Sequence, residues 1–224
     1  MRSFQLRCVI PLACLLLSSN ALGEKLSQKL KKPSMNPTIS LSTTFDKKSA
    51  QHGVLSYRVS NHSQQDIYLL TPLTDNRGGH ILAMPPRVYV QMVDAKLVQL
   101  SKQVWPIPDM LDVYMPEMPF LTKLPAGQSF TEDLQLPLPL ISNFPYRFYA
   151  DAGKNIQRRA VNVVAQSLVF SIAYVGQDVM QAAGALTPEP GQSYFSLSYG
   201  DAVAKQQVLT SNKIAVDVPV TDMQ

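Results

Sequence analysis

Apolar and polar residues alternate one by one along much of this 224-residue chain, and this pattern limits its fold class more than any other feature. Residues 38–45, TISLSTTF, and 54–60, VLSYRVS, show it most clearly. Successive side chains of a strand point to opposite faces, so a period of two is typical of a strand with one face in the core. Residues 54–60 and 67–71 are expected to form a hairpin across the turn formers of 61–66. Further strands are expected at 88–92, 96–100, 129–140, 161–175, 194–199 and 214–220.

The spacing of these strands predicts an all-β fold. Turn-forming residues separate them at intervals of roughly 8–20 residues, which is the pattern of an antiparallel sandwich or barrel. Helix is expected only around Asp178–Ala183, with Gly184 as its end. Residues 151–160 are the candidate internal boundary, so the strands of 151–224 either extend the first β structure or form a small second β domain.

The first 23 residues have the pattern of an export signal. Arg2 and Arg7 precede a short apolar stretch over 8–17, and the small-residue exit Ala21-Leu22-Gly23 stands before Glu24. The stretch is shorter than the roughly 20 residues that cross a bilayer, so we expect a cleaved signal peptide over 1–23. The sequence therefore predicts an exported protein, periplasmic or secreted.

Both cysteines of the chain, Cys8 and Cys14, lie in this signal. Its removal leaves no thiol, which excludes disulfides, thiolate metal sites and thiol nucleophiles from the mature protein. An exported chain without disulfides favours a bacterial source.

The charge of +4 comes from the N-terminal region. Of the 20 basic residues, two lie in 1–23 and four in the predicted flexible linker 24–36, which leaves 14 against 15 acidic residues elsewhere. A phosphate-binding surface should be basic on the folded body itself, so no nucleic-acid partner is expected. The four linker lysines would give at most weak contact with an anionic membrane, at about 1 kcal/mol per basic residue. They are Lys25, Lys29, Lys31 and Lys32.

No motif of the sequence assigns a catalytic or cofactor-binding residue. His52, His62 and His80 fall in three different loops or strand ends, and no metalloprotease, hydrolase-elbow, P-loop or dinucleotide motif occurs. We therefore expect no enzyme activity and no cofactor, with a serine-type hydrolase assembled through space as an open alternative. Asn61-His62-Ser63 matches a glycosylation sequon, which we interpret as a chance match.

The segment 104–125 combines five prolines with methionines and the single tryptophan. Three interpretations stay open: a packed loop, a protein-contact surface and a Cu(I) site, because thioethers suit Cu(I) and also fill irregular cores. The candidate metal ligands are Met110, Met115 and Met118. The candidate partner-binding residues are Trp105, Tyr114, Met115, Met118 and Phe120, since such side chains dominate contact hot spots.

The segments LSYRVSNHSQQDIYLL (55–70) and LPAGQSFTEDLQLPL (124–138) resemble parts of bacterial exported immunoglobulin-like modules. This resemblance implies an antiparallel immunoglobulin-like β-sandwich over 37–150, with one extended sandwich or two sandwiches in the whole chain. Fold alone does not give function.

We predict a non-enzymatic interaction or accessory module with an unknown protein partner. Strand addition at the edge of 129–140 is a second contact mode, after the 104–120 loop. The alternatives are a periplasmic Cu(I)-binding protein and a periplasmic assembly chaperone.

Overall fold

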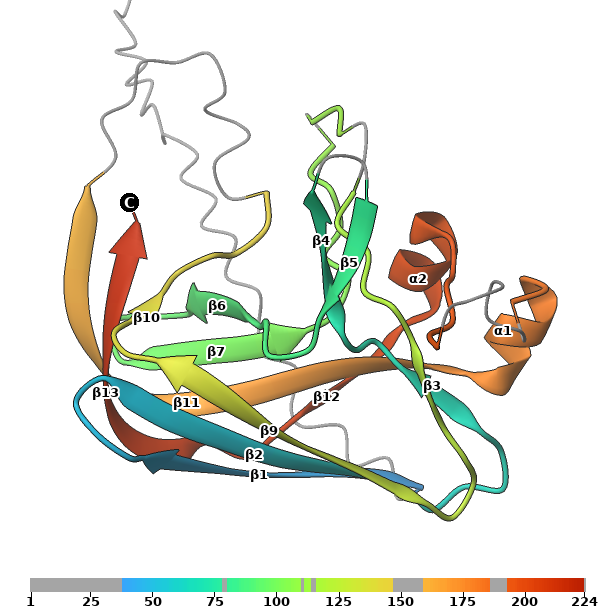
Figure 1. Cartoon of the computed structure of the whole chain (residues 1–224), viewed down its shortest axis with the longest axis horizontal. Coiled ribbons are helices and arrows are strands. Elements are labelled where there is room, and N and C mark those ends of the chain that lie inside the picture. Colours follow the sequence, from blue (N-terminus) through green and yellow to red (C-terminus); the bar gives the residue numbers. More distant parts are fainter. Residues whose placement is uncertain are drawn as a thin grey trace, which may run out of the picture. The chain divides into compact units, whose positions relative to one another are not determined.

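A computed structural model describes residues 38–77, 80–109, 111–113, 116–146, 159–185 and 193–223 (Figure 1). Strands hold 54% of these residues and helices 8%, which confirms the predicted all-β class. The predicted signal peptide and the linker with its four lysines lie outside the described residues. All described elements belong to one unit, 32–224.

The first sheet has three antiparallel strands in the order β1-β2-β9. They are β1 (Ile39–Lys47), β2 (His52–Asn61) and β9 (Ser129–Pro137). The predicted alternation is confirmed along β2, where Leu55, Tyr57 and Val59 are buried.

The second sheet has eight strands arranged around one long strand, β11 (Ala160–Gly176). β11 pairs antiparallel with β3, β12 and β13 and parallel with β7. Strands from before residue 150 and from after residue 159 thus share one sheet. The other members are β3 (Ile67–Leu69), β6 (Tyr89–Met92), β7 (Leu97–Lys102), β8 (Thr122–Leu124), β10 (Leu140–Ile141), β12 (Gln207–Thr210) and β13 (Ile214–Met223).

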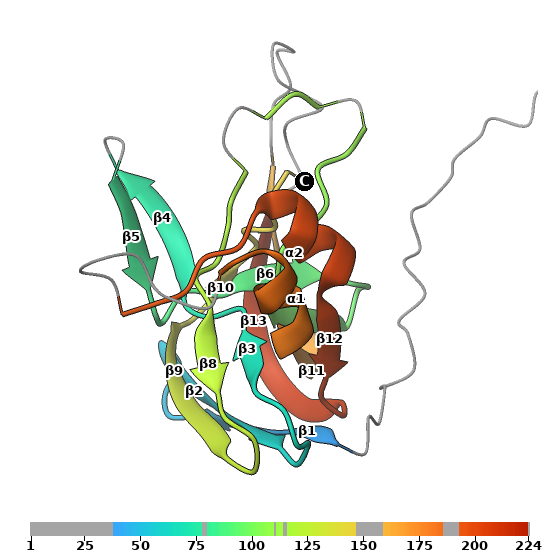
Figure 2. The same cartoon turned by 90° about the vertical axis from the view of Figure 1, so that its right-hand side faces the viewer.

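A separate two-stranded sheet is formed by β4 (Leu73–Arg77) and β5 (His80–Met84), which pair only with each other among the described strands. This β4–β5 hairpin projects from the two larger sheets in Figures 1 and 2.

Two short helices follow β11 among the described residues. The predicted helix is confirmed as α1 (Gln177–Ala182), and Gly184 after it has φ +66°, a conformation that glycine adopts readily. The strand predicted at 194–199 is wrong. Only Phe195 makes an isolated bridge, and the Ser198 hydroxyl then accepts a hydrogen bond from the Asp201 amide to cap α2 (Tyr199–Lys205).

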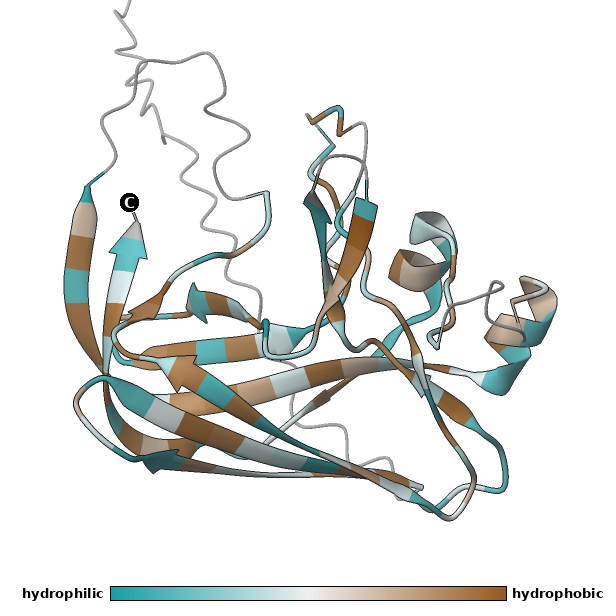
Figure 3. Ribbon diagram, viewed as in Figure 1, coloured by the Kyte–Doolittle hydropathy of each residue, from teal (hydrophilic) through white to brown (hydrophobic). Residues whose placement is uncertain are grey.

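One hydrophobic cluster contains side chains of both larger sheets. Tyr57 of the first sheet lies 4.5 Å, centroid to centroid, from Phe170 of the second. Figure 3 shows the period-two alternation of apolar and polar residues along β1, β2 and β9. The core therefore sits between these sheets, and the outer face of the three-stranded sheet is polar.

The hairpin predicted between 54–60 and 67–71 is wrong. β2 pairs with β1 and β9, whereas β3 pairs with β8 and β11, so the chain changes sheets across 62–66. Asn61 holds this crossing. Its buried amide donates to the carbonyls of Gln65, Leu124 and Pro125 at 2.9–3.2 Å.

Candidate functional site

Trp105, the first of the predicted partner-binding residues, lies inside the protein. Its side chain is 7% exposed and packs with Leu73, Tyr89 and Tyr146. It also meets Phe144 edge-on, with ring centroids 4.5 Å apart. The indole Nε1 has no hydrogen-bond partner among the described residues. This indole therefore contributes core packing at the base of the β4–β5 hairpin.

Two further predicted residues also contact other parts of the chain. Met118 packs against the cluster that contains Tyr68 and Leu70. Phe120 stacks on Tyr194 with centroids 5.5 Å apart and an interplanar angle of 8°. Met110, Tyr114 and Met115 lie outside the described residues, so the Cu(I) hypothesis stays a prediction.

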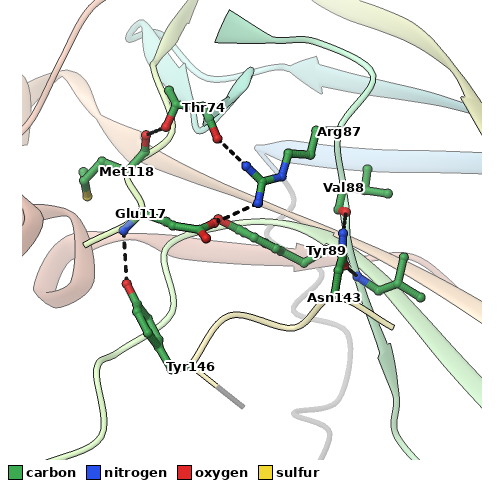
Figure 4. A network of polar contacts seen from close by, with 9 residues as sticks. Thr74, Arg87, Val88, Tyr89, Glu117, Met118, Asn143 and Tyr146 are labelled. Carbon is green, nitrogen blue, oxygen red and sulfur yellow. Dashed lines mark hydrogen bonds and ion pairs between the residues drawn. The ribbon is translucent and has the colours of Figure 1, made fainter. Parts of the chain in front are cut away.

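A polar network fixes the segment before Met118 (Figure 4). The Glu117 carboxylate accepts a 2.7 Å hydrogen bond from the Tyr89 hydroxyl and lies 3.3 Å from the Arg87 guanidinium. The Glu117 amide donates to the Tyr146 hydroxyl. Burial raises the pKa of Tyr89, and the neighbouring Glu117 charge adds to this effect. The phenol therefore stays protonated and donates to Glu117, which connects β6 to the segment before Met118.

The three histidines do not form one site. His52 begins β2 and His62 follows its end, so ten residues of extended chain, about 30 Å, separate them. His52 contacts the Gln135 amide oxygen at 3.2 Å and His62 lies 3.5 Å from the Ser40 hydroxyl. His80 lies on the separate β4–β5 hairpin. Within the described ranges, no three His, Cys, Asp or Glu residues gather as metal ligands do.

A buried ion pair joins the two larger sheets. Lys102 of β7, whose side chain is 0% exposed, lies 2.7 Å from the Glu132 carboxylate of β9. The Tyr57 hydroxyl donates to the same carboxylate oxygen, and the ammonium lies 5.8 Å from the Tyr57 ring centroid. Burial lowers the pKa of Lys102, while Glu132 opposes this shift. Burial likewise raises the pKa of Tyr57.

The same ammonium fastens both ends of the β4–β5 hairpin. Its other two hydrogen bonds go to the Thr71 hydroxyl, before β4, at 3.0 Å and to the Pro85 carbonyl, after β5, at 2.8 Å. All three donors of Lys102 are therefore used, and this offsets part of the cost of burying the charge. Lys102 thus links the hairpin to the core.

The outer edge of β9 has no strand beside it among the described residues. The Asn61 amide donates to the Gln128 carbonyl, and the Leu138 amide donates to the Gln51 carbonyl. The register of β2 and β9 has no shift between these two pairs. The N–H and C=O groups of the even-numbered residues of β9 therefore face β2, and those of the odd-numbered residues face outward. Pro137, which lacks an N–H, falls on the outward set.

Sequence reasoning missed the Lys102–Glu132 pair, although the signal was present. Lys102 has the same parity as Val98 and Leu100, and Glu132 has the parity of Phe130 and Leu134, so period two places both charges inward. Their opposite signs indicate a pair, because buried charges need partners. The sequence does not show which strands face each other, so the two charges could not be paired from it.

None of the described helices has the length and hydrophobicity that a bilayer crossing needs. Comparisons with protein-family models, with curated proteins and with solved structures gave no match in any of the three searches.

Proposed function

We propose that this chain is an exported, non-enzymatic interaction module that binds an extended segment of a partner protein along β9. The observation that carries this proposal is the edge of β9, nine residues long, which no described strand covers and whose odd-numbered backbone groups are directed outward. An unpaired edge offers a row of N–H and C=O groups to an added strand. Such binding takes its affinity from main-chain hydrogen bonds and its specificity from side-chain pockets.

The side chains around this edge support a strand that is apolar on one face only. On the inner face, half-buried Phe130 and the Glu132 carboxylate, 17% exposed, lie next to the edge. The outer face is polar and exposed. It carries Ser129, Thr131, Asp133 and Gln135. We expect the bound segment to place apolar residues toward Phe130 and small polar residues on the other face.

The proposal includes an immunoglobulin-like sandwich for the two larger sheets and cleavage of the signal after Gly23. The shared hydrophobic cluster of the sheets supports the first part. Glu24 should then be the first residue of protein purified from the periplasm or the medium. N-terminal sequencing that starts at Met1 would contradict export by this signal.

The binding mode can be tested with a photoreactive amino acid at Thr131 in the producing cells. The adduct should persist in Asp133→Ala, because this variant keeps the outward N–H of β9. It should disappear in Asp133→Pro, which removes that N–H without removing a bond to β2. Thermal unfolding of both variants checks that each is folded.

Two outcomes would contradict the proposal. One is an adduct that survives in a folded Asp133→Pro variant, since binding would then not use the backbone of β9. The other is the absence of any adduct from position 131 when the same photoreactive amino acid at another exposed position gives one.

A further inference from the structure

The sequence of β5 lacks the protection that exposed edge strands usually have. Its five residues, HILAM, contain no Lys, Arg, Asp, Glu or Pro, and Pro85 and Pro86 follow directly. Ile81 is 54% exposed and Leu82 is 44% exposed, on opposite faces of the hairpin. Natural edge strands are usually protected from pairing by charges, prolines or bulges. β5 is instead apolar from Ile81 to Met84 and ends at the two prolines.

The register of the hairpin shows which backbone groups of β5 are free. Arg77 lies opposite His80 across a two-residue loop, so these two residues exchange hydrogen bonds. Paired hydrogen bonds of this kind recur at every second residue pair of the hairpin. The N–H and C=O groups of Ile81 and Ala83 therefore point away from β4. Within the described part of the chain, no backbone hydrogen bond outside the hairpin reaches either residue.

The opposite edge of the hairpin is already occupied. The Thr74 carbonyl of β4 accepts a 2.6 Å hydrogen bond from Arg87, and the Thr74 hydroxyl donates to the Met118 carbonyl (Figure 4). Figure 2 shows β5 on the far side of β4 from the larger sheets. The edge of β4 is therefore covered at Thr74, and β5 is the more accessible edge for a new strand.

We propose that a second copy of this chain occupies this edge, so that two β5 strands pair antiparallel about a twofold axis at Leu82. In this register, Ile81 faces Ala83 of the second copy, and these residues exchange the hydrogen bonds that are free in the monomer. Leu82 then faces the second copy's Leu82 in a non-hydrogen-bonded pair, with Cα atoms about 4.5 Å apart. The edge can thus pair with a copy of itself. β5 contains no Lys, Arg, Asp or Glu, so no two such charged side chains meet between the paired β5 strands.

The short strand also sets the strength of this dimer. Five residues a side with two exposed apolar side chains bury less than the roughly 1,200 Å² of a standard stable interface. The dimer should therefore form and dissociate with protein concentration. The β4–β5 hairpin is held to the core through Lys102, so it presents the same edge in both copies. This inference is independent of partner binding at β9.

Cysteine cross-linking tests the register. In a background with Cys8→Ser and Cys14→Ser the chain has no other thiol. Leu82→Cys should form a disulfide dimer under mild oxidation, because the expected Cα separation lies within disulfide range. Ile81→Cys should cross-link much less although Ile81 is more exposed, because the second copy's Ile81 lies diagonally across the axis. Ile141→Cys is a second control, because Ile141 lies on β10, is 62% exposed and is not part of the proposed interface.

Sedimentation velocity over a wide concentration range tests the interface without new thiols. The unmodified chain should shift toward dimer as concentration rises. Ala83→Pro, which removes an outward N–H, should stay monomeric, and Leu82→Lys should do the same by placing two charges face to face. A monomer at all concentrations, or equal cross-linking at residues 81, 82 and 141, would overturn the proposal. Cross-linking of Leu82→Cys to a different protein alone would also overturn it.

Discussion

Lys102 is a fully buried cation whose three donors bind three separate segments of the chain: β9, the residues before β4 and those after β5. A buried pair of this kind costs desolvation energy and recovers it only while every partner is present. Loss of one member should therefore be far more harmful than loss of both.

We predict that Lys102→Met lowers the free energy of unfolding by about 3–5 kcal/mol, because it leaves Glu132 charged and partly buried. The double variant Lys102→Met, Glu132→Gln should recover most of this loss. Urea denaturation of the wild type, both single variants and the double variant gives the coupling energy. Additive losses would show that the pair does not act as a unit.

The ion pair also predicts a pH dependence. Burial lowers the pKa of Lys102 below the 10.5 of an unfolded lysine, so between these two values the unfolded chain binds more protons than the folded chain. The free energy of unfolding should therefore rise with pH through this window. The slope of unfolding free energy against pH is compared with that of the double variant below about pH 9, where few unfolded tyrosines are ionised. Equal slopes for the two proteins would contradict the assignment.

Asn61 gives a second prediction at the level of single residues. Its side chain is 0% exposed and its amide donates to three carbonyls at the sheet crossing. Asn61→Ala should therefore cost about 1–3 kcal/mol of unfolding free energy, by removing these hydrogen bonds inside the fold. His62→Ala next to it, on an exposed residue, should cost far less. Equal melting temperatures for the two variants would be the contrary result.

The environment of Asn61 also bears on the glycosylation sequon. A sugar on this nitrogen would have to replace hydrogen bonds inside the fold, so the folded protein cannot accept one there.

At the scale of elements, the alternation of apolar and polar residues was sufficient to predict the strands that are long and half-buried. β1, β2, β11 and β13 were all expected within a few residues of their bounds. α2 was not expected, because Tyr194–Tyr199 alternates like a strand while the Ser198 cap and Asp201 start a helix within it. Pairing partners could not be read from the pattern, since period two fixes the face of a strand and not its neighbour.

The free edge of β9 predicts an alternation in amide hydrogen exchange. The amides of Thr131 and Asp133 point outward and should exchange rapidly, whereas those of Leu134 and Leu136 bond to β2 and should exchange slowly. Residue-resolved exchange measured by NMR checks this without any partner. Uniform slow exchange along β9 would mean that another segment covers the edge.

At the scale of the whole molecule, the eight-stranded sheet joins strands that are far apart in the sequence. β7 pairs with β11 over six residues, and β10 pairs with β13. The candidate boundary at 151–160 therefore lies between strands of one sheet. Charged and polar residues mark that segment as a loop in the sequence, but composition does not report which strands meet on either side of it.

This topology predicts that residues 37–150 do not fold alone. Without β11, the strands β3 and β7 lose their central partner, and Phe170 no longer packs on Tyr57. Circular dichroism and urea titration of the fragment should show no cooperative transition. A cooperative transition like that of the full chain would mean that 37–150 is a domain in its own right.

If the chain is exported as proposed, and crosses the membrane amino end first, the position of β11 also has a kinetic consequence. More than a hundred residues, which include β1 to β10, emerge before the central strand that pairs with β3 and β7 arrives. Contacts between distant segments form slowly, and waiting strands tend to aggregate. The yield of native protein should therefore depend on how quickly the last third of the chain follows. A chaperone that binds the early strands should raise this yield.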